Sequence, residues 1–305
     1  MHQEIFHEEL KKIATRVFAE NAEMTEAFLD TLYLDGLRCD KHFYESLRYS
    51  LMAGGKRVRP TLVLEFCRLF GGDVQDALPF AAAVEMIHTS SLIHDDLPCM
   101  DDDDLRRGRP TNHKVYGEAV ALLAGDGMFM DAFGVAAGNT LVSPEIRAEA
   151  VRLLSLATGS YGMVKGQIID MFGESNKLTE DELITLHNNK TGALIRVSAQ
   201  LGCLAAGFFS DSPEMAAAEA YANRVGLAFQ IVDDILDATS TPEAMGKSVG
   251  SDAAHNKNTF LSFHTIEEAQ AMADRMTEEA VGAIKDLPAS DRLCAVAAYL
   301  AVRKH

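Results

Sequence analysis

Residues 80–111 read FAAAVEMIHTSSLIHDDLPCMDDDDLRRGRPT, and this stretch decides both the fold class and the chemistry. Residues 80–94 are apolar around most of a helical circumference, which is typical of a helix enclosed in a large bundle. Six carboxylates then fall within the ten residues 95–104, and three arginines follow. Crowded carboxylates repel one another unless cations lie between them. The run therefore predicts either a solvated acidic loop or a site for hard cations such as Mg²⁺.

The rest of the chain also reads as helical. Proline occurs only 8 times, and capping signals predict helix starts near residues 144, 180 and 213. These signals are Ser143-Pro144, Thr179 with Glu182, Ser212-Pro213 and, more weakly, Thr241-Pro242. No window alternates apolar and polar residues as a half-buried strand does. With no linker-like segment, the sequence predicts one all-α domain spanning residues 1–305.

Composition and charge narrow the function. The 305 residues include 28 Lys plus Arg and 45 Asp plus Glu, which gives a net charge of −17. This charge disfavours binding to nucleic acid or to an anionic membrane surface. The lack of an uninterrupted apolar run of about 20 residues predicts no membrane span. Five dispersed cysteines indicate reduced thiols and a cytoplasmic location. An anionic substrate would therefore need local positive charge or bound cations.

A second carboxylate group lies on another apolar helix, residues 221–237. The polar positions on one face of this helix are Gly226, Gln230, Asp233 and Asp237. Carboxylates on an apolar helix are costly unless they are paired or bind a metal. In the first group, Asp95 and Asp101 are six residues apart, a spacing that does not place them on one face of a straight helix. Pro98 can end or distort the helix so that Asp101 folds back toward Asp95.

Basic groups elsewhere supply the opposite charge. Residues 54–60, GGKRVRP, combine two glycines with three cations, which suits close contact with a phosphate group. A basic surface turn has the same composition, and the spacing is not that of a P-loop. His88 lies on the same helical face as Asp95, where a satisfied core histidine is the commoner case. Lys190-Thr191-Gly192 and Gly246-Lys247 are weaker signals.

Together these groups predict a single site. Two acidic clusters would hold Mg²⁺, the ions would hold one diphosphate, and Lys and Arg side chains would hold a second diphosphate directly. The apolar helices would line a cavity for a hydrocarbon tail. Bound ions would also reverse the local sign of a strongly acidic chain.

These residues resemble the trans-isoprenyl diphosphate synthase family, the farnesyl and geranylgeranyl diphosphate synthases. The resemblance runs from about Gly54 to Lys257 and continues weakly to Arg303. It is carried, in family order, by GGKRVRP at 54–60, DDLPCMD at 95–101 followed by DDDLRRGRPTNH, KTG at 190–192, FQIVDDILD at 229–237 and GK at 246–247. One departure follows Lys257, where Asn258-Thr259-Phe260-Leu261 replaces the usual Thr-Tyr-Pro.

The resemblance implies mostly antiparallel helices around a deep central cavity, a homodimer and three Mg²⁺ ions. It implies metal ligation by Asp95, Asp101 and Asp233, with Asp96 and Asp237 as further ligands or partners of ligands. It implies binding of isopentenyl diphosphate by Gly55, Lys56, Arg59, His88 and Arg107. It implies binding of the allylic substrate, or catalysis on it, by Arg106, Lys190, Thr191, Gln230, Lys247 and Lys257.

The implied reaction needs no nucleophilic Ser or Cys. The allylic C–O bond ionises, the double bond of isopentenyl diphosphate attacks the cation, and a proton is lost. In the family, Ser91 and Ser90, four and five residues before the first acidic motif, would form the floor of the tail cavity. Farnesyl-forming bacterial relatives usually carry an aromatic residue at the fifth position. The small Ser90 therefore favours a geranylgeranyl product, with farnesyl as the alternative.

Three other classes fit the sequence less well. A metal-dependent phosphohydrolase would use His94-Asp95, but the ten histidines show no further paired pattern. A terpene cyclase would share the first acidic motif, but its second motif normally mixes Asn, Ser or Thr with Glu. A non-catalytic subunit of a heteromeric synthase typically loses an acidic motif, and both are intact here.

Overall fold

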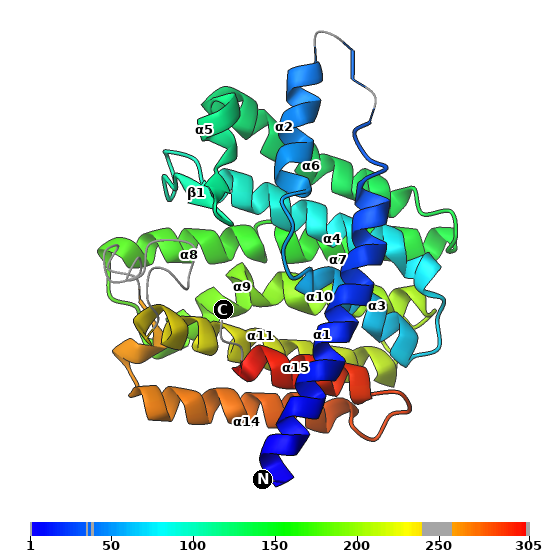
Figure 1. Cartoon of the computed structure of the whole chain (residues 1–305), viewed down its shortest axis with the longest axis vertical. Helices are drawn as coiled ribbons and strands as arrows, with labels where there is room; N and C mark the ends of the chain where they lie inside the picture. The colour runs from blue at the N-terminus through cyan, green and yellow to red at the C-terminus, as the bar shows by residue number, and fades with distance from the viewer. Residues whose placement is uncertain (1, 35, 38–39, 240–257, 303–305) are drawn as a thin grey trace.

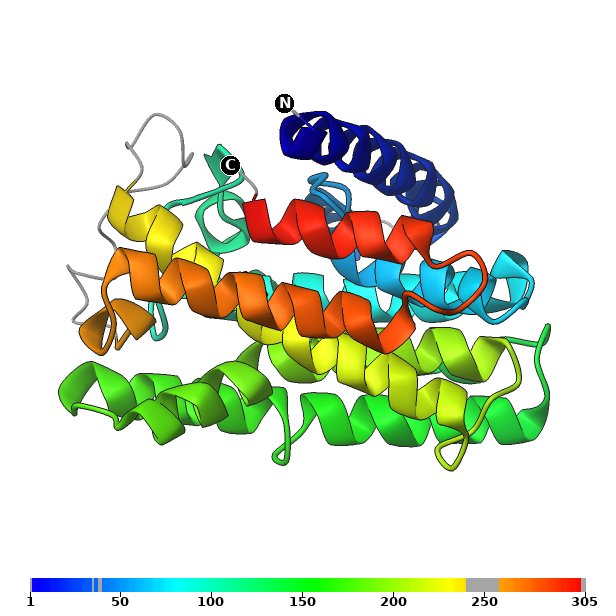
Figure 2. The same ribbon diagram turned by 90° about the horizontal axis from the view of Figure 1, so that it is seen from below.

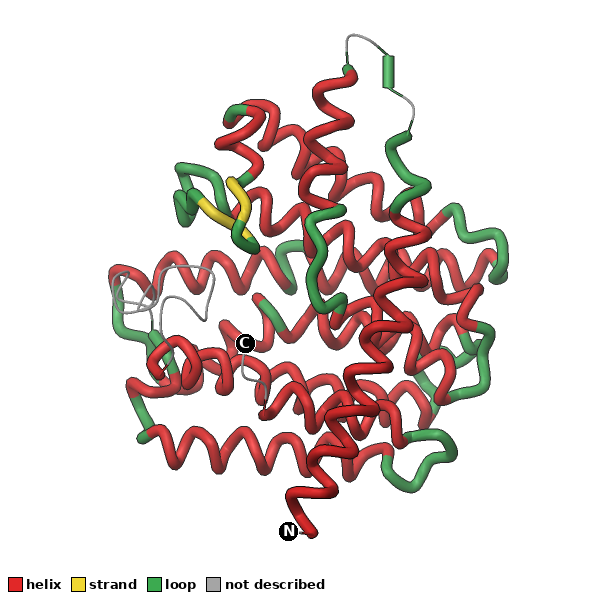
Figure 3. The backbone as a smooth tube through the Cα atoms, in the orientation of Figure 1, coloured by secondary structure: helices red, strands yellow, loops and turns green. Residues whose placement is uncertain are grey.

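The computed structural model describes residues 2–34, 36–37, 40–239 and 258–302, and nearly every element within them is a helix (Figure 3). The helices are α1 (His2–Leu29), α2 (Lys41–Leu51), α3 (Val58–Leu69), α4 (Val74–Asp95), α5 (Asn112–Tyr116), α6 (Glu118–Ala137), α7 (Pro144–Thr158), α8 (Met163–Ser175), α9 (Glu180–Lys190), α10 (Gly192–Ala205), α11 (Pro213–Thr239), α14 (Ile266–Ile284) and α15 (Asp291–Val302). The remaining elements are the strands β1 (Leu105–Arg106) and β2 (Arg109–Pro110) and the 3₁₀ helix η1 (Phe260–Ser262). The all-α prediction is confirmed, and the short β1–β2 hairpin is an addition that the sequence did not predict.

The predicted helix starts at residues 144, 180 and 213 are confirmed. The hydroxyls of Ser143 and Ser212 each accept a hydrogen bond from the backbone N–H three residues on, at 3.4 and 3.1 Å. Thr179 and Glu182 form the expected capping box, in which each side chain accepts a backbone N–H of the other. The weaker signal, Thr241-Pro242, lies outside the described residues.

Helices α4 and α10 form the centre of the bundle. Every residue from Phe80 to Ile87 of α4 is buried, as the apolar circumference of residues 80–94 predicts. Helix α4 packs against α3, α6 and α10, and α10 packs in turn against α11. Figure 1 shows α4, α10, α11 and α14 as successive rows, with α1 crossing over them. Figure 2 shows α1 and α15 on one face and α7 and α8 on the opposite face.

Helix α6 is the element that bears on the prediction of no membrane span. By length and composition alone it could cross a membrane, with a mean hydropathy of 1.5 over a window that is 33% buried, and it is the one such helix among the described residues. This helix packs along α4 and also contacts α2, α5 and α7. Its outer side exposes Leu122, Leu123 and Met130. These contacts make α6 a structural helix of the bundle with one uncovered apolar side.

Candidate active site

The first acidic cluster forms where α4 ends. The helix stops at Asp95, and the chain then folds back so that the backbone N–H of Asp101 donates to the carbonyl of Asp95 at 2.9 Å. The return that the sequence predicted around Pro98 is therefore present. It brings the two predicted metal ligands of this motif to the same end of α4.

Burial raises the pKa of Asp95 to about 6. The ammonium of Lys190 opposes this shift, and the carboxylate of Asp101 adds to it. A carboxylate that is partly desolvated beside another carboxylate is stabilised in its ionised form by a cation. This end of α4 therefore favours a positive ligand.

Lys190 stands at the end of α9 and forms an ion pair with Asp170 of α8. Burial lowers the pKa of Lys190, but the carboxylates of Asp170 and Asp95 outweigh this effect, and the net shift is upward. The ammonium is therefore fixed in its charged state between two helices. Asp170 was not predicted from the sequence, although it stands one helical turn after Gly166, where α8 touches the backbone of Lys190.

The second acidic cluster lies on α11. Gln230 donates from Nε2 to Asp233 Oδ2 at 3.3 Å, and Asp237 is half-buried one turn further on. At Gly226 the helix passes close to α10, since a Cβ there would lie 3.3 Å from the Cα of Gly192. The predicted polar stripe therefore faces the junction of α9 and α10, which carries Thr191.

Asp234, the middle carboxylate of the motif, has a structural part. It is 8% exposed, and its Oδ2 accepts the backbone N–H of Phe260 at 2.7 Å. Phe260 is fully buried and stacks on His187 of α9, with 5.3 Å between ring centroids. In the segment Asn258–Leu261, which departs from the family pattern, Phe260 is thus held by packing and by a hydrogen bond.

The cationic cluster begins at a tight turn before α3. Gly54, Gly55 and Arg57 have φ values of +79°, +126° and +48°, a conformation that favours glycine at the first two positions. Arg107 of the β1–β2 hairpin donates to the carbonyl of Gly54. A Cβ on Gly55 would lie 2.8 Å from Arg107 Cζ, so only glycine admits the guanidinium at this distance.

Arg59 and His88 lie next to Arg107. Burial lowers the pKa of Arg59 to about 10, Glu85 raises it, Arg107 lowers it and Asp233 raises it. Arg59 Nε is buried without a hydrogen-bond partner among the described residues. Burial also lowers the pKa of His88 well below its usual value, and the neighbouring guanidinium groups lower it further. The neutral His88 lies among arginines, and one of them, Arg59, has an N–H without a partner among the described residues. This arrangement favours an anionic ligand.

Two further arginines of these motifs pair with carboxylates. Arg57, which the sequence did not distinguish from Arg59, is 2% exposed and pairs with Glu85 at 2.6 Å. Arg106 donates from Nε to Asp96 Oδ1 at 2.9 Å. Asp96 is 3% exposed, so the structure places it as the partner of Arg106.

The remaining predicted residues lie as follows. Lys56 Nζ stands 5.8 Å from the centre of the Tyr299 ring. Ser90 is fully buried and donates to the carbonyl of Ile87, whereas Ser91 is half-buried on the Asp95 side of α4. Lys247 and Lys257 lie outside the described residues.

The carboxylates fit one particular mode of Mg²⁺ binding. Within the described ranges no three His, Cys, Asp or Glu side chains are close enough to enclose an ion by themselves. Mg²⁺ is commonly bound by one or two carboxylates together with substrate phosphates and water. Oxygen ligands on two separate helices, with Asp95 desolvated at one of them, match that mode. The residues therefore fit an ion that is bound together with a diphosphate.

Comparisons with known proteins match most of the chain. A family model described as Polyprenyl synthetase matches residues 40–296. The chain is 45% identical over 261 residues to the farnesyl diphosphate synthase of Micrococcus luteus, covering 85% of this chain and 89% of that protein. It is 43% identical over 293 residues to heterodimeric geranylgeranyl pyrophosphate synthase large subunit 1, chloroplastic, of Arabidopsis thaliana, covering 93% and 78%.

A solved structure extends the comparison. The geranyltransferase of Helicobacter pylori, complexed with magnesium and isoprenyl diphosphate, matches with a TM-score of 0.83 and 31% identity, covering 92% of this chain and 94% of that one. Together with the helical bundle, these matches define an enzyme of the prenyltransferase class. The chain belongs to the polyprenyl synthetase family. Within that family it is a short-chain trans-prenyl diphosphate synthase, as the sequence resemblance predicted.

The ionisation of Asp95 should be measurable directly. In a ¹³C NMR titration of the ligand-free protein, the Asp95 carboxyl is expected to titrate near pH 6, because burial raises its pKa. Asp104, in the same acidic run, serves as the control, since its hydrogen bond to Lys114 lowers its pKa. Adding Mg²⁺ with inorganic diphosphate should lower the Asp95 midpoint, because only the ionised carboxylate binds a metal. A midpoint near that of an exposed aspartate would contradict this account.

Proposed function

We propose that the protein condenses isopentenyl diphosphate with an allylic diphosphate in a Mg²⁺-dependent reaction and releases an all-trans product, with geranylgeranyl diphosphate favoured. The observation that carries this proposal is that Lys190 acts on the buried Asp95 at the end of α4, while Arg59, Arg107 and the neutral His88 form a second, separate group suited to an anion. Two sites for diphosphates suit two substrates of this kind. The identities of the substrates follow from the family.

On the allylic side, Lys190 and Arg106 would bind the leaving diphosphate. Both cations are fixed in place, Lys190 by Asp170 and Arg106 by Asp96. Fixed positive charge stabilises negative charge that develops on a leaving group without reorganisation. Thr191 and Gln230 would lie beside the allylic cation through their oxygen atoms.

On the other side, Arg59, His88 and Arg107, together with Lys56 and the backbone of Gly55, would bind the diphosphate of isopentenyl diphosphate. This orients its double bond toward the allylic carbon and confines the two reactants at short range. Mg²⁺, held by Asp95, Asp101, Asp233 and Asp237, would supply charge neutralisation for the leaving diphosphate. The family suggests three such ions.

The second candidate product is farnesyl diphosphate. Relatives of both kinds match at similar identity, as the Micrococcus and Arabidopsis proteins show. A non-catalytic subunit of a heteromeric synthase is the alternative from another class. The presence of both acidic clusters supports the catalytic reading.

The activity is tested with purified protein, isopentenyl diphosphate and each of dimethylallyl, geranyl and farnesyl diphosphate, followed by chromatography of the products. Turnover is expected with Mg²⁺, and is expected to vanish in excess chelator because the carboxylate clusters then lack counter-ions. Restoring Mg²⁺ should restore the rate. Full turnover in the chelator would refute the metal dependence, and no product with any starter would refute the synthase itself.

Product length is expected to change at Ser90. Ser90→Tyr should shorten the product if this position limits the cavity, because a ring adds bulk where a hydroxymethyl group now stands. Ser90→Ala is the matched control, and its product should equal that of the wild type. Both variants need a melting temperature, since Ser90 is fully buried and a larger residue strains the packing. A folded Ser90→Tyr enzyme with unchanged products would place the length limit elsewhere.

We further propose a homodimer in the cytoplasm. Besides the family expectation, exposed apolar side chains on α6 and α8 support a second copy as the occupant of that surface; they are Leu122, Leu123, Met130, Val164, Ile168, Met171 and Phe172. The described cysteines are all free, which suits a reducing compartment. Light scattering after size-exclusion chromatography measures the mass, and a monomer at micromolar concentration would reject the dimer.

A further inference from the structure

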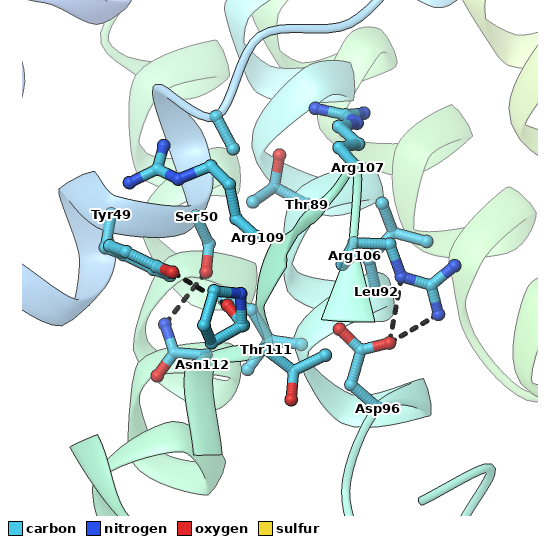
Figure 4. Close-up of a pocket in the computed structure, with 13 residues that line it drawn as sticks. Tyr49, Ser50, Thr89, Leu92, Asp96, Arg106, Arg107, Arg109, Thr111 and Asn112 are labelled. Atoms are coloured by element: carbon cyan, nitrogen blue, oxygen red, sulfur yellow. Dashed lines mark hydrogen bonds and ion pairs between the residues drawn. The ribbon is translucent and has the colours of Figure 1, made fainter. Parts of the chain in front are cut away.

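A pocket lies behind the β1–β2 hairpin, next to the cationic cluster (Figure 4). Helix α2 supplies Tyr49 and Ser50, α4 supplies Thr89, and the hairpin supplies Arg106, Arg107 and Arg109. Asp96, the residue after α4, completes the charged part of the wall. Lys56, Arg59 and His88 are not among its walls. The pocket is therefore distinct from the proposed isopentenyl diphosphate site, although Arg107 borders both.

The charge of the pocket is positive. Asp96 is the one carboxylate in its wall, and it is already paired with Arg106. Arg107 and Arg109 form no ion pair with any carboxylate in the described parts of the chain. The guanidinium of Arg109 lies over the ring of Tyr49, 4.4 Å from its centroid. Two guanidinium groups therefore line the pocket without a carboxylate in direct contact, in a protein whose net charge is −17.

The hydrogen-bond inventory of the walls is unbalanced in the same direction. The hydroxyls of Tyr49 and Thr111 already donate to the carbonyls of Pro110 and Asp103. Ser50 Oγ accepts from Asn112, but its own O–H has no acceptor among the described residues. The donors left for a ligand therefore include the Ser50 hydroxyl and the Arg109 guanidinium, and these fit an oxyanion.

Thr89 is the most informative of these donors. Its neighbours Ser90 and Ser91 donate back to helix carbonyls at 2.9 Å, which is the usual arrangement within a helix. The Thr89 hydroxyl, 3% exposed as a residue, makes no hydrogen bond within the described structure. Figure 4 shows it between Arg107 and Arg109. An anion bound in the pocket would give this buried hydroxyl the acceptor that its own helix does not provide.

We propose that this pocket is a second anion site that binds a phosphate-type oxyanion through Thr89, Ser50 and Arg109. Arg107 links the pocket to the isopentenyl diphosphate site, because it also contacts Gly54. An anion in the pocket competes for Arg107 and weakens binding of isopentenyl diphosphate. The reaction releases inorganic diphosphate, so the product is itself a candidate occupant. The binding step stands on the pocket alone, whereas the coupling rests on the proposed function.

The experiment titrates orthophosphate into the full-length protein by calorimetry. The protein is first saturated with Mg²⁺, isopentenyl diphosphate and a thio-analogue of the allylic diphosphate that cannot ionise, so that both substrate sites are filled. One further phosphate per chain is expected to bind, more weakly than it binds to the protein without isopentenyl diphosphate, because the two ligands compete for Arg107. Arg109→Gln and Thr89→Val should each weaken that binding by about tenfold or more, the usual effect of losing a hydrogen bond to a charged group. Inorganic diphosphate and extra isopentenyl diphosphate are titrated in parallel to identify which source occupies the pocket.

Arg275→Gln is the matched control, since it removes one exposed guanidinium from α14. It should leave phosphate binding unchanged. Steady-state assays provide the coupled readout: phosphate should raise the KM for isopentenyl diphosphate less in Arg109→Gln than in the wild type, with kcat unaffected by the substitution. No additional phosphate in the saturated protein, or equal binding in all variants, would overturn the proposal. Either result in an enzyme that still makes prenyl products would leave the proposed function standing.

Discussion

Replacing Asp233 by alanine is expected to lower kcat by about 10²–10³-fold or more, the scale of losing one group that stabilises transition-state charge. Asp233 accepts a hydrogen bond from Gln230 and lies near enough to Arg59 to raise its pKa. It therefore stands where the acidic and cationic clusters meet. Without it, Mg²⁺ loses a ligand on α11, and the Mg²⁺ concentration for half-maximal rate should rise.

The control for this variant is Asp104→Ala. Asp104 belongs to the acidic run of the first motif, but its side chain is 76% exposed and pairs with Lys114. Its removal should leave kcat within about twofold, as expected of a surface ion pair. Circular dichroism and a melting curve should show both variants folded. Wild-type turnover in Asp233→Ala would remove the metal assignment from α11.

The second large effect is expected at Gly166. A Cβ there would overlap the backbone N and Cα of Lys190. Neither backbone can give way easily, so Gly166→Ala should destabilise the fold by about 1–3 kcal/mol, the cost of overpacking a core. It should also lower kcat by about 10²-fold, because a displacement of about 1 Å suffices to misplace a catalytic group.

Gly282→Ala is the comparison for this variant. Gly282 lies on α14 with no atom within 4 Å of a Cβ at that position. Alanine is a better helix former than glycine, so this variant should be stabilised by about 0.5–1 kcal/mol. An active Gly166→Ala enzyme with unchanged stability would show that α8 and Lys190 are not in the contact described here.

The helical elements were accessible from sequence because their signals are local. Capping residues such as Ser143 and Thr179 act within four residues of chain, and the apolar circumference of α4 is visible in one window. The β1–β2 hairpin has only two residues per strand, too few for alternation to show. The exposed apolar side of α6 was also not predicted from the sequence, because acidic residues interrupt the apolar run of this helix.

The roles of individual charged residues were harder to predict. Arg57 and Arg59 are two residues apart in one motif, and they are distinguished by the distant Glu26 and Glu85, which both pair with Arg57. The same holds for Lys190, whose partner Asp170 is 20 residues away on another helix. Sequence patterns place such groups in a common region. Which charge pairs with which depends on how the helices pack.

In each pair of adjacent aspartates, the two side chains have different partners. In one motif Asp96 fixes Arg106, and in the other Asp234 binds the backbone N–H of Phe260, whereas Asp95 and Asp233 are the proposed metal ligands. The two aspartates of a pair are therefore not interchangeable. Ion preference can therefore be changed by substituting Asp95 or Asp233. Substituting Asp96 or Asp234 would loosen the neighbouring chain segment and obscure any change in ion binding.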